Sequence, residues 1–223
     1  MNSDFVVLNG DYLSVFIGNG DGTFVQMPDI DVAGTATDLV VKDLSGDLIP
    51  DLAVTMAGYS VLTFLGDGLG NFTISQVLPT TGVPSQIVAT DFDGDALQDL
   101  AVATDGVVHI FRAVSLFNYG AASTVTAGTF PIDLVAADFN GDSNVDLAVQ
   151  NRDSYDVTIL LGTGAGTFNF AQTISQLSGS GLTGQLICDD FDGDMIPDLL
   201  SSNGFEIIWI KGLRNGTFDP AIS

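Results

Sequence analysis

The sequence predicts an all-β propeller built from four-stranded blades, and three observations carry this prediction. An acidic nine-residue loop returns four times, and its first aspartates (Asp43, Asp91, Asp138 and Asp190) are 48, 47 and 52 residues apart. A repeat length in this range is typical of propellers and solenoids. The segments around the loops are short, rich in Val, Ile, Phe and Thr, and have no sustained helical period, so strands are expected. A glycine-rich hairpin that ends in phenylalanine also recurs along the chain.

Within one repeat the predicted strands follow one another in order. In the second unit they are residues 86–90 before the loop, 100–104 after it, 107–111 next, and a less regular stretch over 115–125. Other units contain continuously apolar runs, such as residues 61–65 and 157–161. A strand that is apolar on both sides is expected to be covered on both faces. Blades stacked against neighbouring blades would provide that cover.

The glycine-rich hairpins show where each repeat begins and ends. They read GNGDGTF, GDGLGNF, GTGAGTF and GLRNGTF, and they begin at Gly18, Gly66, Gly162 and Gly212. Their Asn-Gly and Asp-Gly pairs suit the positive φ angles of tight hairpins. The last aspartate of a loop precedes its hairpin by 14 to 16 residues, and Asp4 precedes Gly18 by 14, so Asp4 marks the tail of a fifth loop. We expect one domain over residues 1–223, with a partial blade at 1–27 and complete blades at about 28–75, 76–125, 126–172 and 173–223.

The second complete unit departs from this pattern. The segment RAVSLFNYGA, residues 112–121, stands where a glycine-rich hairpin is expected. We interpret it as a drifted turn. A specialised surface is the alternative, because Arg112, Phe117 and Tyr119 would bring a rare cation and two aromatic rings together.

Composition excludes several classes of protein. The chain has 223 residues and is 46% apolar, enough for a substantial core. Its net charge is −23 with five basic residues in all, whereas nucleic-acid binding requires clustered lysine and arginine. We therefore expect no nucleic-acid partner, and no run is long enough for direct membrane insertion. The single cysteine, Cys188, cannot form an intrachain disulfide and is expected to be a buried structural thiol.

The acidic loops have the side chains of a metal site. Oxygen-bearing residues occupy loop positions 1, 3, 5 and 9, as a hard cation such as calcium requires. A single copy could be a solvated turn, since Asp and Gly are turn residues, but four copies with the same pattern favour a metal. An EF-hand is excluded because its glycine lies at position 6 and its glutamate at position 12. Here glycine is at position 4 and the twelfth residue is valine or serine.

Together, the loops and hairpins resemble the FG-GAP and VCBS repeats, which form the calcium-bearing, integrin-like β-propeller and recur in bacterial surface proteins. The resemblance covers nearly the whole chain and implies four-stranded blades with calcium in the loop between the first two strands. It implies about four ions, held by side chains at positions 1, 3, 5 and 9 and by the backbone carbonyl at position 7. Serine at position 3 makes the first loop the weakest candidate. The implied ligands are Asp43, Ser45, Asp47, Ile49 and Asp51; Asp91, Asp93, Asp95, Leu97 and Asp99; Asp138, Asn140, Asp142, Asn144 and Asp146; Asp190, Asp192, Asp194, Ile196 and Asp198.

The number of blades leaves three interpretations open. Propellers of this family usually have seven blades, more than this chain can supply. It could close as a five-bladed ring, be a piece of a larger propeller, or complete its open blade with a strand from another subunit. We favour about five blades with an irregular or intermolecular closure.

The resemblance favours a calcium-stabilised, extracellular or cell-surface scaffold for cell adhesion or ligand binding, although the sequence begins without a signal peptide. Its partner would be a protein or glycan. A structural subunit that binds copies of itself is the alternative, and a carbohydrate-active enzyme ranks last. We expect no enzyme, because His109 is best explained as a satisfied strand residue and Trp209 as core. Sequons at Asn71 and Asn215 are candidate N-glycan sites.

Overall fold

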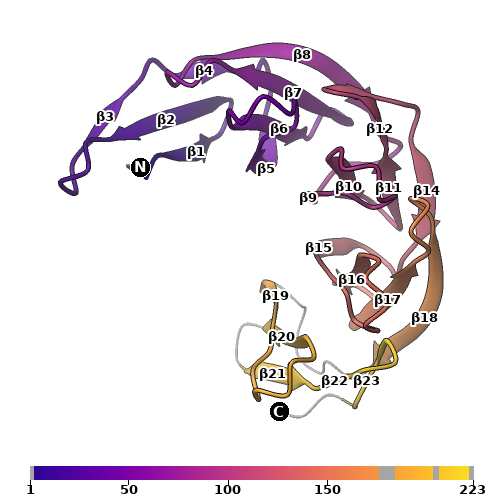
Figure 1. Ribbon diagram of the computed structural model, residues 1–223. Helices are drawn as coiled ribbons and strands as arrows, with labels where there is room; N and C mark the ends of the chain where they lie inside the picture. The colour runs from indigo at the N-terminus through magenta and orange to yellow at the C-terminus, as the bar shows by residue number, and fades with distance from the viewer. Residues whose placement is uncertain (1–2, 176–183, 203–205, 221–223) are drawn as a thin grey trace.

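The computed structural model describes residues 3–175, 184–202 and 206–220, and these residues form only strands, turns and loops. Figure 1 shows the strands grouped into sheets that follow one another around an arc. This confirms the all-β prediction and the repeated antiparallel sheets. Within the same ranges no helix has the length and apolar character that a membrane crossing requires.

Four sheets have four strands each, and in three of them the strands pair in one continuous order, with every strand antiparallel to its neighbours. Their strands run from the inside of the arc to the outside, and the acidic loop joins the first strand to the second (Figure 1). The second sheet contains β5 (Ala36–Lys42), β6 (Asp51–Met56), β7 (Ser60–Gly66) and β8 (Phe72–Pro79). The third contains β9 (Gln86–Thr90), β10 (Asp99–Ala103), β11 (Val107–Phe111) and β14 (Ser123–Thr126). The fourth contains β15 (Pro131–Ala137), β16 (Asp146–Asn151), β17 (Asp156–Gly162) and β18 (Phe168–Ser175).

The core lies between successive sheets. Strands β6, β10 and β16 are buried along their whole length. One cluster joins Ala53 of the second sheet to Val102 of the third, and another joins Ile159 of the fourth to Leu199 of the fifth. Both faces of a middle strand therefore lose contact with water, which explains the continuously apolar runs in the sequence.

The first and last sheets differ from these three in the way their strands pair. In the first, β1 (Phe5–Asn9) pairs with β2 (Tyr12–Gly18), and β3 (Phe24–Gln26) and β4 (Ile30–Asp31) both pair with β2 on its outer side. The last sheet contains β19 (Leu186–Asp189), β20 (Asp198–Ser202) and β21 (Ile207–Ile210), followed by a hairpin of β22 (Gly212–Leu213) and β23 (Thr217–Phe218). The Asp4 carboxylate accepts a hydrogen bond from the Gly18 amide at 2.8 Å. Because Asp51 does the same for Gly66, β1 corresponds to the second strand of a complete sheet.

The outer strands extend beyond the blade boundaries expected from the sequence. Strands β4, β8 and β18 end at Asp31, Pro79 and Ser175, three or four residues past the boundaries placed at 27, 75 and 172. In β8 and β18 the register shifts by a β-bulge, after which pairing with the third strand continues. The extra length follows from this continued pairing.

A two-residue turn replaces the glycine-rich hairpin of the third sheet. Strands β12 (Ala113–Ser115) and β13 (Asn118–Tyr119) form it, and Phe117 adopts a positive φ of 55°. The Tyr119 side chain is buried, in the place that phenylalanine takes in the other hairpins. Arg112 instead extends to an acidic loop, so Arg112 and the two aromatic rings do not gather into one surface.

Two kinds of polar junction join the sheets. Between the second and third, the Asp38 carboxylate accepts from the Ile87 amide at 2.9 Å, and the Gln76 side chain donates to and accepts from the Tyr119 backbone, both at 3.1 Å. Between the fourth and fifth, Asp133 binds the Leu186 amide at 2.7 Å, and Gln172 binds the Phe218 backbone in the same way. Between the third and fourth, the Ser85 hydroxyl donates to the Pro131 carbonyl at 2.9 Å.

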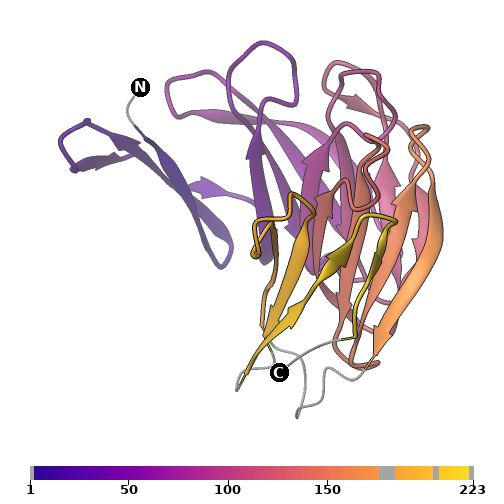
Figure 2. The ribbon, with the colours of Figure 1, turned by 60° about the horizontal axis from the view of Figure 1, so that its bottom comes forward.

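The arc does not close over the described residues. Figures 1 and 2 both show the first sheet standing apart from the last. The inner strands β5, β9, β15 and β19 line the concave side (Figure 1). The number of blades in the complete propeller and the way it closes stay predictions.

Candidate metal-binding loops

Four acidic loops join an inner strand to the second strand of its sheet. We number them loop 1 (residues 43–51), loop 2 (91–99), loop 3 (138–146) and loop 4 (190–198). Because each loop joins the first strand of its sheet to the second, all four loops lie on the same face of the arc, at the same end of their strands. The hairpins between the third and fourth strands lie at this end as well, since strand direction alternates.

The position-1 aspartate organises each loop. In loop 2 one oxygen of Asp91 accepts from the Gly94 amide at 2.7 Å and the other accepts from the Ala96 amide at 2.8 Å. The backbone can wrap the carboxylate in this way because Gly94 and Ala96 have φ angles of 80° and 67°. The other three loops repeat this pair of bonds through Asp43, Asp138 and Asp190. The sequence indicated the glycine but not the left-handed residue at position 6.

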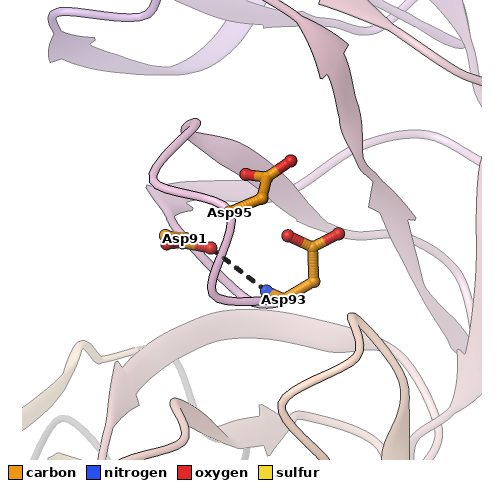
Figure 3. Close-up of side chains that lie close together, drawn as sticks. All are labelled: Asp91, Asp93 and Asp95. Carbon is orange, nitrogen blue, oxygen red and sulfur yellow. Dashed lines mark hydrogen bonds between the residues drawn. The ribbon is translucent and has the colours of Figure 1, made fainter.

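Carboxylates at positions 1, 3 and 5 converge in two of the loops. Each of Asp91, Asp93 and Asp95 has an oxygen within 4.8 Å of the others, and the same holds for the equivalent aspartates of loop 4. Figure 3 shows the three side chains of loop 2 close together. Such a set of oxygens fits calcium, which takes several carboxylate ligands in flexible geometry. In loops 1 and 3 the third position offers the Ser45 hydroxyl or the Asn140 amide, and that amide donates to Asp142 at 3.0 Å.

The position-9 aspartates have a role that the sequence did not reveal. Asp51, Asp99, Asp146 and Asp198 are each 0% exposed. One oxygen of each accepts from the amide of loop position 2, and the other accepts from the amide of the first hairpin residue 14 to 16 positions later. The narrow range of spacing between loop and hairpin was the sequence signal for this bond. The part that these aspartates would take in holding a cation stays a prediction.

The position-7 residues lie against the position-5 carboxylates. Their amides donate to those carboxylates at 2.8 to 3.0 Å in all four loops. The residues concerned are Ile49, Leu97, Asn144 and Ile196. Their carbonyls as metal ligands likewise stay a prediction.

Loops 2 and 4 each contact a basic side chain. The Arg112 guanidinium lies 3.5 Å from the Asp93 carboxylate, and the Lys211 ammonium binds both Asp192 and Asp194, the latter at 2.7 Å. These hydrogen bonds raise the pKa of Lys211 and lower that of Asp194. Arg112 and Lys211 each directly precede the hairpin residue that binds the position-9 aspartate.

Burial and like charges act together on the position-9 aspartates of loops 2 and 3. Burial is the main cause that raises the pKa of Asp99 to about 6, and repulsion from Asp93 and Asp95 adds to it. The pKa of Asp146 also rises to about 6, for the same main cause and with repulsion from Asp142 and Asp138. A divalent cation in the loop would offset this repulsion.

Other singled-out residues have structural surroundings. His109 is buried, and its Nε2 accepts from the Thr81 amide at 3.2 Å, as expected for a satisfied strand histidine. Trp209 is half-buried instead of core, and its indole N–H donates to Asp198 of loop 4 at 3.2 Å. Cys188 is half-buried rather than fully buried, and burial is the main cause that raises its pKa to about 12. Both sequon asparagines, Asn71 and Asn215, are exposed on hairpins.

Comparisons with known proteins give a family and a fold. A model of the FG-GAP-like repeat matches the chain three times, at residues 43–102, 91–149 and 138–201. No curated protein matches the sequence. Among solved structures, a lectin of Agrocybe aegerita that specifically recognises non-reducing terminal N-acetylglucosamine has a TM-score of 0.72 and 17% identity, over 100% of this chain and 63% of that one.

A second solved structure is similar to a lesser degree. BBS1N in complex with ARL6DN has TM-scores of 0.66 and 0.62 in its mercury- and lead-soaked forms, at 12% and 14% identity. Each comparison covers 98% of this chain, and 62% and 75% of the matched chains. This chain thus spans less than two thirds of the lectin and of the mercury-soaked form. At these identities the likeness shows a shared fold.

Proposed function

Since the chain belongs to the FG-GAP-like repeat family, we propose that it is a calcium-stabilised propeller that serves as an extracellular or cell-surface scaffold for ligand binding or adhesion. The convergence of three carboxylates in loops 2 and 4 is the observation that carries the calcium proposal. Side chains at positions 1, 3 and 5 would hold the ion, and calcium would supply the positive charge that joins mutually repelling carboxylates.

The expected effect of calcium is on stability. Fourteen of the 28 acidic residues lie in the four loops, and four divalent ions would cancel eight of the charges. Extracellular calcium modules bind with dissociation constants on the order of 10⁻⁴ to 10⁻³ M. At roughly ten-fold saturation, one such site stabilises the fold by about 1.4 kcal/mol. Several sites together would amount to a large part of the stability of a typical domain.

Thermal melting in calcium and in a chelator tests this proposal. We expect the midpoint to rise in millimolar calcium, and the rise to shrink in Asp91→Asn and Asp190→Asn, which alter the residue around which loops 2 and 4 fold. Asp105→Asn is the matched control, because Asp105 is exposed in the turn between β10 and β11, outside the four loops. A wild-type midpoint that is the same in calcium and chelator would refute the calcium proposal.

The ligand of the scaffold is proposed to be a glycan or a protein. The similar lectin recognises N-acetylglucosamine and the similar BBS1N forms a complex with ARL6DN, so both classes occur on this fold. A groove of about 650 Å³ runs along the inner strands and is lined by Lys42, Gln86 and Gln185 among other residues. A glycan array probed with the calcium-loaded protein tests the glycan arm. The groove would be the glycan-binding site if binding is lost in the double variant Gln86→Ala, Gln185→Ala and kept in the exposed control Asn118→Ala.

Self-assembly is the second candidate, because β1 has a free edge. Within the described residues β1 pairs only with β2, and Phe5 and Val7 are 42% and 43% exposed. The equivalent strand β6 pairs on both sides and is buried throughout. An edge of this kind can accept a strand from a second subunit. Mass photometry tests this: oligomers that grow with concentration and disappear in Val7→Lys support it, and a monomer at every concentration excludes it.

We also propose that the chain is not an enzyme. The buried His109 has partners on both ring nitrogens, since its Nδ1 lies 3.3 Å from the Thr104 hydroxyl. The loop aspartates are engaged by backbone amides in a pattern that suits a cation. Turnover of a glycoside substrate by the purified protein would overturn this proposal.

A further inference from the structure

The four acidic loops differ in one respect that their folding does not require. Loops 2 and 4 have aspartate at position 3, whereas loops 1 and 3 have Ser45 and Asn140. Counted over positions 1, 3, 5 and 9, loops 1 and 3 have three carboxylates and loops 2 and 4 have four. The additional carboxylate raises the repulsion among groups that lie within a few ångströms of one another.

The type of residue directly before each hairpin varies with the number of carboxylates in the loop of the same sheet. This position is fixed in space, because the residue that follows it donates its amide to the position-9 aspartate of the same sheet. It is Leu65 beside loop 1, Arg112 beside loop 2, Leu161 beside loop 3 and Lys211 beside loop 4. At this position leucine accompanies three carboxylates and a cation accompanies four, so each loop together with this one residue has a formal charge of −3.

The two cations contact the carboxylates that would hold a metal. Lys211 binds Asp192 and Asp194, at positions 3 and 5 of loop 4, and its side chain is 29% exposed. Arg112 reaches position 3 of loop 2 from 3.5 Å and is 54% exposed. A Cβ placed on Gly166 would lie 2.4 Å from the Arg112 Cδ, so the Arg112 stem also packs against the next hairpin. Lys211 is therefore the better test of charge alone.

We infer that Lys211, and more weakly Arg112, is a tethered counter-ion that competes with calcium for its own loop. The inference rests on the proposed calcium binding. In the metal-free protein the ammonium offsets the fourth carboxylate of loop 4 and stabilises the fold. When calcium binds, the same ammonium must leave Asp192 and Asp194 or remain beside a divalent cation, and either outcome lowers the affinity. The cation thus brings loop 4 closer in charge to loops 1 and 3.

Trp209 provides a readout specific to loop 4. It is the only tryptophan of the chain, and its indole N–H donates to Asp198, at position 9 of that loop. Terbium prefers the same oxygen ligands as calcium, and a nearby indole sensitises its luminescence. Tryptophan-excited terbium luminescence, displaced by calcium, therefore measures the calcium affinity of loop 4 in the presence of the other loops.

The decisive variant is Lys211→Leu, which installs the residue found beside loops 1 and 3. We expect it to tighten calcium at loop 4 by about three- to five-fold, the scale of one partly exposed ion pair. In chelator its melting midpoint should fall by about 2–4 °C, and in calcium it should match or exceed wild type. Lys211→Arg, which keeps the charge, should behave as wild type in both conditions.

Two results would overturn the inference, and they can be told apart from failure of the proposed function. If Lys211→Leu leaves the calcium affinity unchanged or weakens it, the ammonium does not compete with the metal. If its midpoint falls equally in chelator and in calcium, Lys211 has only a structural role. If wild-type protein shows neither terbium luminescence nor a calcium-dependent midpoint, the proposed calcium site fails, and the inference fails with it.

Discussion

The buried aspartate at loop position 9 joins two parts of each sheet that are distant in sequence. A carboxylate loses much solvation when it is buried, so it persists in a core only with hydrogen-bond donors on both oxygens. Asp146 has them: the Phe139 amide at 2.9 Å and the Gly162 amide at 2.7 Å. The residue that looked in sequence like one more metal ligand is also the connection between loop and hairpin.

Asp146→Ala should therefore destabilise the fold whether or not calcium is present. The substitution leaves two buried amides without an acceptor, at a cost of about 2–6 kcal/mol. Chemical denaturation in calcium and in chelator measures the change, with Asp105→Ala as the exposed control. A loss of stability seen only in calcium would assign Asp146 to the metal alone.

The pH dependence of the calcium-free protein follows from the same residues. Asp99 and Asp146 have folded-state pKa values of about 6, and burial also raises the pKa of Asp38 and Asp133. A carboxyl with a raised pKa binds its proton more tightly in the folded state, so stability rises as pH falls from 7 toward 4. His109 acts in the opposite direction, because burial lowers its pKa.

With four such carboxyls against one histidine, we expect the chelated protein to melt at a higher temperature at pH 5 than at pH 7.5. In calcium the difference between the two melting temperatures should be smaller, because at pH 7.5 the bound ion already offsets the repulsion. Calorimetry at the two pH values decides the matter, and a lower midpoint at pH 5 would show that the histidine or other groups outweigh the aspartates.

At the scale of elements, the strands and loops were predictable because their signals are local. Short apolar runs between turn residues predicted β7, β10 and β17, and the burial of most residues in these strands explains their composition. The glycine that the sequence places at loop position 4 adopts the left-handed conformation with which the loop wraps Asp91. These features depend on neighbours within a few residues.

What sequence reasoning missed depends on contacts between elements. The bond from a position-9 aspartate to the hairpin spans 14 to 16 residues, and the contact of Lys211 with Asp192 spans 19. Trp209 was expected in the core because it lies among isoleucines, but its indole N–H donates to Asp198 of loop 4. The open arc could not be read from the repeat, since the angle between sheets is set by packing along their whole length.

Between elements, the Gln172 side chain should stabilise the last sheet against the fourth. Its amide binds the Phe218 backbone through a donor and an acceptor, at 3.1 and 2.8 Å. Gln172→Ala is expected to cost about 1–3 kcal/mol and to increase amide hydrogen exchange around Phe218. Gln26→Ala, which removes an exposed glutamine from an outer strand, is the matched control. Unchanged exchange at Phe218 would show that apolar packing alone holds the junction.

At the scale of the whole molecule, the net charge of −23 opposes the compact state. Salt screens that repulsion over about 10 Å at 0.1 M. We therefore expect the melting midpoint in chelator to rise by several degrees between low salt and about 0.2 M sodium chloride, and to change less in calcium. Equal salt responses in the two conditions would mean that the loops contribute little of the repulsion.

The polar junctions between sheets alternate in kind, and the alternation has a mechanical consequence. Carboxylate and glutamine bridges join the second sheet to the third and the fourth to the fifth, whereas a serine hydroxyl bridges the third to the fourth. Arg112 and Lys211 lie in the third and fifth sheets, one in each pair, so the second to fifth sheets form two doublets. Under tension the molecule should part at the seam between doublets, near residue 127, before either doublet unravels.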